Sequence, residues 1–339
     1  MSATNKYVSE NVMDMIVNLD PLLFNGITVC VSVCTLCVCL IGVAANVINI
    51  QLFRRQGYQD GVNVTLTALA VSDLGALIME LAYAVNFNPL IKETDRKVSR
   101  LAIAVISGYS HEYFIRVSSA ITTFAAFKRC LCVTRPLKVK AMISTRMAVY
   151  VNACVFLGYS LYFFLNFYTK YLDWAYVPEL NMTVVSVFLR SSYFSFFPVT
   201  LYFTDLLLPY ATFTILISCS VLLFHALQSK SKWRQSISIA GDKLSNLTYK
   251  ERKSAKLFMS VSIMCVSLLL PEYLLFDSMI FIKGLSLGGK YSDVREVVSS
   301  CIDLLKTLNS SLTIVIYYKM STKFRLEFNN IMGRRAQAH

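Results

Sequence analysis

Residue types that enzymes use for catalysis and metal binding are scarce in this sequence of 339 residues. Only three histidines occur, His111, His225 and His339, which excludes a metal centre built from clustered histidines. No nucleophile, base and acid form a catalytic constellation, so we do not expect an enzyme. The net charge is +13, but the basic residues form no stripe or domain, which argues against nucleic-acid binding.

Cysteine is absent from the segments that separate the apolar runs. Four of the ten cysteines lie in the first apolar run, and the others are Cys130, Cys132, Cys154, Cys219, Cys265 and Cys301. We therefore expect no extracellular disulfide framework and interpret these residues as small buried hydrophobes. The chain also opens without the pattern of a cleaved signal peptide, so we expect the first helix to direct its own insertion.

Long apolar runs dominate what is present. Hydrophobic residues make up 55% of the chain, and the mean hydropathy is +0.54. About twenty apolar residues cross a hydrocarbon layer as a helix. Seven such runs cover residues 26–53, 64–87, 101–134, 145–169, 198–228, 253–282 and 297–318. This predicts an all-α, seven-transmembrane helix bundle over residues 26–320, with an N-terminal segment (1–25) and a tail (321–339).

Lys and Arg indicate the orientation, because they are more frequent in the predicted inner loops and tail than in the outer loops. The N-terminus is then extracellular and the protein a multi-pass protein of the plasma membrane. The Asn181 sequon falls in the outer loop between helices four and five, where it can be glycosylated. Eight basic residues from Lys230 to Lys256 face the cytoplasm and can attract anionic lipid or an acidic partner. Residues 321–328 predict a short amphipathic eighth helix on the cytoplasmic membrane surface, with Phe324 and Phe328 on one side.

Several motifs occur in a fixed order along these helices. They are Asn46, Leu69-Ala70-Val71-Ser72-Asp73, Arg129 followed by Pro136, Pro209, Pro271, and Asn309-Ser310 followed by Tyr317 and Phe324. In this order and spacing the chain resembles the rhodopsin-like (family A) G-protein-coupled receptors over nearly its whole length. Residues 129–133, 135–140, 287–291 and 317–321 are similar to molluscan orphan chemosensory receptors, which are distant relatives of FMRFamide-type peptide receptors. The resemblance implies a receptor that converts binding of an extracellular small molecule or short peptide into activation of a heterotrimeric G protein.

The motifs also depart from the family pattern. Lys128 replaces the acidic residue before the helix-three arginine, and Ala104 replaces the cysteine that begins the outer disulfide. Glu251 has the spacing of the helix-six partner of that arginine. We therefore predict an Arg129–Glu251 latch at the inner end; the alternative is that Glu251 simply faces water.

The resemblance assigns Asp73 as a sodium-binding carboxylate, with Asn46, Ser118, Asn309 and Ser310 around it. No other cofactor is implied. Oxygen ligands around one carboxylate suit a hard cation. The alternative is a hydrated polar core that only packs the helices.

A second polar set lies nearer the outside. His111 stands about 27 Å further out than Arg129 at about 1.5 Å per residue, which is the depth of the family's ligand pocket. A largely neutral histidine there disfavours amine ligands. The predicted ligand-binding residues are His111, Glu112, Arg116, Asp205, Glu272, Asp303 and Lys306. Glu112 with Arg116 and Asp303 with Lys306 can neutralise each other within their helices, which leaves acid at Asp205 and Glu272 for a cationic or zwitterionic ligand.

Charge inside the membrane also marks ion paths, so a transporter or channel is the main alternative function. The sequence shows no internal repeat or paired broken helices, which favours the receptor.

Overall fold

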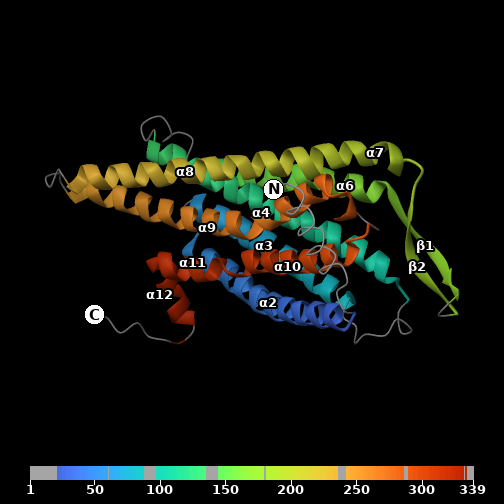
Figure 1. Cartoon of the computed structure of the whole chain (residues 1–339). Helices are drawn as coiled ribbons and strands as arrows, with labels where there is room; N and C mark the ends of the chain where they lie inside the picture. The colour runs from blue at the N-terminus through green and yellow to red at the C-terminus, as the bar shows by residue number, and fades with distance from the viewer. Residues whose placement is uncertain are drawn as a thin grey trace.

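Long helices lie side by side in the computed structural model and form one elongated bundle (Figure 1). The structure describes residues 21–59, 61–87, 97–134, 144–178, 181–235, 242–285, 289–331 and 333, without the side chains of 21, 227, 229–252 and 283. The helices are α2 (Pro21–Gln56), α3 (Gly61–Phe87), α4 (Arg100–Thr134), α6 (Thr145–Tyr168), α7 (Tyr193–Thr200) continued by η4 (Leu201–Leu207) and α8 (Leu208–Gln235), α9 (Asp242–Phe281), and α10 (Ser292–Ser311) continued by α11 (Thr313–Met320). These correspond in order to the seven predicted spans, so the predicted helical bundle is confirmed.

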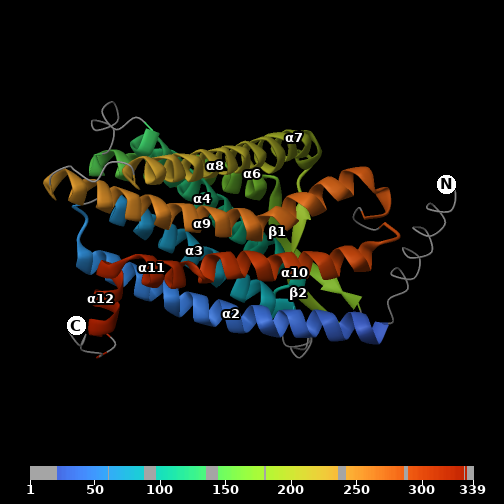
Figure 2. The same ribbon diagram turned by 60° about the vertical axis from the view of Figure 1, so that its left-hand side comes forward.

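The two ends of the bundle differ. A hairpin of β1 (Lys170–Val177) and β2 (Met182–Leu189) extends from one end, and α12 (Thr322–Ile331) crosses the other (Figures 1 and 2). A short 3-10 turn, η5 (Lys283–Leu285), follows α9. The hairpin therefore marks the predicted outer end, and α12 the predicted inner end.

Four predicted boundaries were wrong, and the two at the inner segment were wrong because hydropathy detects only the part of a helix that lipid surrounds. The segment 229–252 was expected to be a loop, but α8 runs on to Gln235 and α9 begins at Asp242. Lys, Arg and Glu are good helix formers, so helices continue into water where apolar residues stop. The helix before α8 already begins at Tyr193, and the last span begins at Ser292 and is interrupted at Leu312.

The eighth helix was predicted correctly, but one of its aromatic residues does not face lipid. Phe324 is completely buried, with its ring centroid 5.6 Å from that of Phe53 and 5.7 Å from that of Tyr317. Phe328 stacks on Phe324 at 6.4 Å. Phe324 therefore anchors α12 to the inner end of the helix bundle, in addition to any contact of α12 with the membrane surface.

Backbone hydrogen bonds attach the hairpin to the outer start of α4. Val185 donates its N–H to the carbonyl of Lys97 at 2.9 Å and accepts from the N–H of Ser99 at 2.8 Å, and Ser99 Oγ donates to Ser186 Oγ at 3.1 Å. All ten cysteines are free. The hairpin is thus held at this end of the bundle by a parallel bridge between Val98 and Val185, without a disulfide.

Candidate functional site

Two of the long helices carry charge in the middle of the bundle. Five helical runs are long and apolar enough to cross a membrane, but α4 and α10 are not among them. Glu112 and Arg116 lie on α4, and Asp303 and Lys306 on α10. An ionised side chain at a bilayer centre costs at least about 2.5–3.5 kcal/mol, so each of these groups requires compensation.

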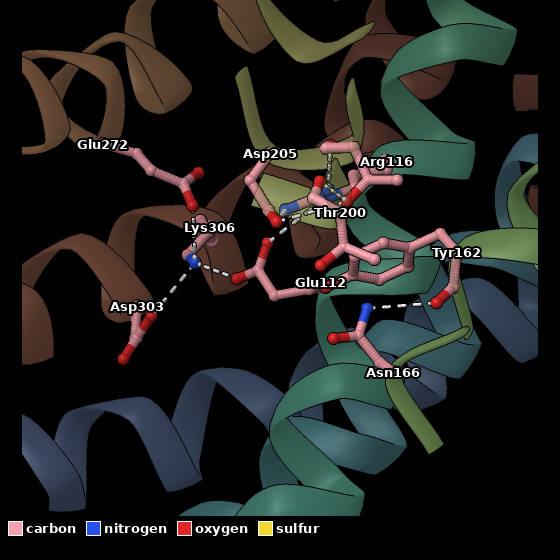
Figure 3. A network of polar contacts seen from close by, with 10 residues as sticks. Glu112, Arg116, Tyr162, Asn166, Thr200, Asp205, Glu272, Asp303 and Lys306 are labelled. Carbon is pink, nitrogen blue, oxygen red and sulfur yellow. Dashed lines mark hydrogen bonds and ion pairs between the residues drawn. The ribbon is translucent and has the colours of Figure 1, made fainter. Parts of the chain in front are cut away.

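Lys306 lies between three carboxylates from three helices (Figure 3). Its Nζ donates to Glu112 Oε1 on α4 at 2.5 Å and to Glu272 Oε1 on α9 at 3.2 Å. Asp303 Oδ1, one turn earlier on α10, lies 3.2 Å from the same nitrogen. The lysine side chain is only 5% exposed, so these ion pairs replace its water shell and join α4, α9 and α10.

Arg116 forms a second centre on the same side of α4 (Figure 3). Its Nη2 donates to Asp205 Oδ1 at 2.6 Å, and its Nη1 donates to the carbonyl oxygen of Thr204. Glu112 Oε2 lies 3.9 Å from Nε, and the guanidinium carbon lies 4.3 Å from the ring centre of Tyr162. Glu112 therefore links the arginine centre to the lysine centre.

A proline explains why the carbonyl of Thr204 is available. Leu208 donates its N–H to the carbonyl of Phe203, five residues back, which is the π-helical pattern of η4. In this register the next donor to Thr204 would be residue 209, but Pro209 has no N–H. π-helical turns are frequent at functional sites, and here the turn presents both Asp205 and a free carbonyl to Arg116.

Two cavities open beside these ion pairs. One, of about 200 Å³, is lined by Glu112, Arg116, Asp205 and Glu272 together with Tyr210, Tyr273 and other apolar or aromatic groups. The other, of about 470 Å³, is lined by Glu80, His111, Glu112, Arg116, Asp205 and Asp303, with Tyr83, Tyr109 and Tyr162. Because Glu112, Arg116 and Asp205 line both, the two cavities share one charged wall.

His111 is buried at the edge of the larger cavity. Its Nδ1 lies 3.0 Å from the carbonyl oxygen of Ala76 and 3.7 Å from Glu80 Oε2. A carbonyl only accepts, so Nδ1 carries the proton and Nε2 is the acceptor in the neutral ring. Nε2 is buried without a hydrogen-bond partner among the described residues, while other atoms of His111 line the larger cavity.

Six of the seven predicted outer residues line one or both of these cavities. Lys306 lines neither cavity but forms ion pairs with Glu112, Glu272 and Asp303. The prediction that Asp205 and Glu272 have no basic partner was wrong. Asp205 pairs with Arg116, and Glu272 pairs with Lys306. Pairing across helices was not visible in the sequence, which shows only neighbours on one helix. The ion-pair cluster nevertheless has more acidic than basic groups. Its four carboxyl groups belong to Glu112, Asp205, Glu272 and Asp303, and its two cations to Arg116 and Lys306. Sequence reasoning missed Tyr162 and the Thr204 carbonyl, although Pro209 was a signal for the latter.

The polar core around Asp73 lies deeper in the bundle. Ser118 donates to Asp73 Oδ1 at 2.7 Å, and Asn46 Nδ2 donates to the carbonyl of Ser310 at 2.8 Å. Asp73 Oδ2, Asn309 Oδ1 and Thr313 Oγ1 are buried without a hydrogen-bond partner among the described residues. A buried carboxylate oxygen without a partner, and further unpartnered buried oxygens on α10 and α11, are the kind of ligand that suits a hard cation such as sodium.

At the inner end, Arg129 is 8% exposed and its guanidinium carbon lies 5.4 Å from the ring centre of Phe258 on α9. Lys128 precedes it on α4, Tyr317 is buried on α11, and Pro271 lies inside α9. Pro136 and the side chain of Glu251 lie outside the described part of the chain, so the predicted latch stays a prediction.

The Asn181 sequon lies at the turn between the hairpin strands. Asn181 is exposed and has a φ of 47°, and its Oδ1 accepts a hydrogen bond from Tyr176 at 2.7 Å. The position is open to a glycosylating enzyme if this end of the bundle is outside.

Comparison with known proteins gives the family. No curated protein matches the chain. The family model of the serpentine type 7TM GPCR chemoreceptor Srw matches residues 33–335, which include α12 and all of the long helices except the beginning of α2. That family consists of membrane receptors and is not an enzyme family. The seven-helix bundle, its charged outer site and this match together identify the chain as a member of the Srw family of serpentine seven-transmembrane GPCR chemoreceptors.

Proposed function

We propose that this chemoreceptor binds a cationic or zwitterionic ligand, either a small molecule or the end of a short peptide, in the two outer cavities. The observation that carries the proposal is the wall of Glu112, Arg116 and Asp205 that both cavities share. Four carboxyl groups around two cations leave acid that a ligand ammonium or guanidinium group can neutralise. A ligand carboxylate would compete for Arg116, whose guanidinium binds such groups in a bidentate manner.

Binding there would change how the helices are joined. The ion pairs of Lys306 and Arg116 link α4 to η4, α9 and α10. A ligand that replaces one partner stabilises a different arrangement of these helices, in proportion to its difference in affinity for the two arrangements. We propose that the inner ends of α8 and α9 then engage a heterotrimeric G protein. The basic residues from Lys230 to Lys256 support contact with an acidic partner surface or with anionic lipid.

We further propose that sodium binds at Asp73, with Asn309, Ser310 and Ser118 as oxygen ligands. The unpartnered oxygens described above support this assignment. The same residues would serve a hydrated polar core, so the test is whether sodium alone changes the protein.

We also propose the orientation of the protein in the membrane and its relationship to particular groups of receptors. The distribution of Lys and Arg supports an extracellular N-terminus in the plasma membrane. The ordered motifs support a rhodopsin-like (family A) receptor, and the stretches around Arg129 and Tyr317 support kinship with molluscan chemosensory and FMRFamide-type receptors.

The test is nucleotide exchange on a purified G protein by the receptor in lipid vesicles, with a library of small cations, zwitterions and short peptides. We expect Asp205→Asn and Glu272→Gln to reduce the potency of an activating ligand at unchanged surface expression. Asp173→Asn is the matched control, because Asp173 lies exposed on β1. Unchanged potency in both site variants would contradict the proposed pocket.

The same vesicles address the transporter or channel alternative. Ion current or substrate flux without a G protein, combined with no exchange for any ligand, would favour that alternative. The main support for a transporter or channel was the charge inside the membrane. The ion pairs give those charges partners within the protein, so the charges do not require an ion path.

A further inference from the structure

An apolar groove lies on the outside of the bundle between α6 and the α7–η4–α8 run. Its volume is about 510 Å³, and residues such as Val155, Gly158, Leu161, Phe196, Val199 and Phe203 line it. The surface around it continues in the same character, since Leu157, Leu161 and Phe164 of α6 are 72%, 62% and 65% exposed. In a membrane-spanning bundle such a face contacts lipid, so the groove is continuous with the lipid-facing surface.

The two threonine hydroxyls in the groove already have hydrogen-bond partners in the protein. Thr200 Oγ1 donates to the carbonyl of Phe197 at 2.9 Å, and Thr204 Oγ1 donates to the carbonyl of Thr200 at 2.5 Å. Threonine hydroxyls that bond their own helix have no donor left for a ligand. Most of the remaining lining is apolar and no charged residue takes part in it, so the groove suits a flexible apolar chain better than a headgroup.

Gly158 creates part of the space. A methyl group placed on Gly158 would meet no atom within 4 Å, although the glycine lies inside a regular helix. A helical glycine costs about 1 kcal/mol relative to alanine. Empty space that water does not fill also forgoes dispersion contacts, and an acyl chain restores them.

Only one layer of side chains separates the groove from the charged site. Tyr159 lines the groove and the smaller outer cavity, and Tyr162 lines the groove and the larger one. Tyr162 and Thr204 are also the residues that hold Arg116 through its ring contact and its carbonyl bond. Whatever fills the groove therefore supports two of the groups that position Arg116.

We propose that this groove binds the acyl chain of a membrane phospholipid, and that the bound chain stabilises Tyr162 and Thr204 in the position that holds Arg116. The site is distinct from the ligand cavities and does not depend on G-protein coupling.

The test uses the full chain in nanodiscs of phosphatidylcholine that contain a phospholipid with a photoreactive diazirine on its acyl chain. After irradiation, mass spectrometry maps the labelled peptides. We expect labelling at groove residues of α6 and α7 in the wild type and loss of that labelling in Gly158→Leu. Gly26→Leu is the matched control, since Gly26 is an exposed helical glycine on α2 that also has nothing within 4 Å. If Gly158→Leu does not fold, Val199→Phe replaces it in the experiment, because this substitution fills the groove from the opposite side.

A second measurement tests whether the bound acyl chain stabilises the protein around the groove. Removal of phospholipid by detergent should lower the melting temperature of the wild type more than that of Gly158→Leu, whose leucine replaces the chain. Equal labelling of Gly158→Leu and wild type, or equal shifts on delipidation, would overturn the proposal. So would a sterol analogue that labels the groove and displaces the phospholipid, or a cross-link through α6 to a second copy of the receptor.

Discussion

Lys306 carries the clearest energetic prediction, because one buried ammonium group lies between three carboxylates. Lys306→Met keeps an unbranched side chain of similar length and removes the charge together with the N–H groups that donate to Glu112 and Glu272. Glu112, Glu272 and Asp303 would then lie together with no cation at 2.5–3.2 Å. Removing one partner of a buried ion pair costs about 3–5 kcal/mol. Since the carboxylate side chains are 25–34% exposed, water screens part of this cost, and we expect about 3 kcal/mol, near the lower end of that range.

The assay is thermal unfolding of the purified receptor followed with a thiol-reactive dye. All ten cysteines are free, and several are buried, so unfolding exposes reactive thiols. A loss of about 3 kcal/mol corresponds to roughly a hundredfold change in the folding equilibrium, at about 1.4 kcal/mol per factor of ten. Lys319→Met is the control, because Lys319 is exposed on α11 and the chemical change is the same.

A double variant separates the ion pair from loss of packing. Glu112→Gln alone should cost less, because Lys306 keeps Glu272 and Asp303. Combined with Lys306→Met it should recover part of the loss, with a coupling of about 0.5–3 kcal/mol. A wild-type melting temperature for Lys306→Met, or strict additivity in the double variant, would refute the reasoning.

Four further predictions concern the tether, the polar core, the inner end and the hairpin turn. Val185→Pro removes the N–H that bonds Lys97, so hydrogen exchange across the hairpin should rise, whereas mild reductant should leave ligand binding unchanged; equal protection in mutant and wild type would argue against the tether. Asp73→Asn should abolish any rise in melting temperature that sodium produces over choline, and a persistent sodium effect would place the ion elsewhere. Glu251→Ala should raise basal nucleotide exchange at matched surface expression, since a bias of about 1.4 kcal/mol changes a rare active fraction about tenfold; an unchanged or lower basal rate would exclude the latch. Asn181→Gln should remove the mobility shift that a glycosidase produces on gels, and a shift that survives the substitution would contradict glycosylation there.

Much of the architecture follows from the sequence because its causes are local. Apolar runs long enough to cross a membrane, and charged residues that end them, are properties of neighbouring residues. The number and order of the helices, the eighth helix and the position of the cysteines within helices were therefore predicted. The helical extensions at Gln235 and Asp242 were missed, since hydropathy does not distinguish a solvated helix from a loop.

The candidate site was only partly within reach of the sequence. Periodicity and family spacing placed the charged residues at one depth, and spacing of three or four residues predicted the pairs within α4 and within α10. Which charges meet across helices depends on how each helix is rotated and how deep it lies, and neither quantity is encoded by any short segment.

Three features were decided by the tertiary structure alone. Lys306 meets Glu112 and Glu272 because α4, α9 and α10 face one another there, and Arg116 reaches the Thr204 carbonyl because a π turn before Pro209 frees it. Val185 holds the hairpin because residues 97–99 pass beside β2. The sequence by itself determined which polar groups a membrane would have to accommodate. The packing of the helices decided which partners satisfy them, because a buried charge is stabilised by whatever lies within a few ångströms in space, however far away that partner is along the chain.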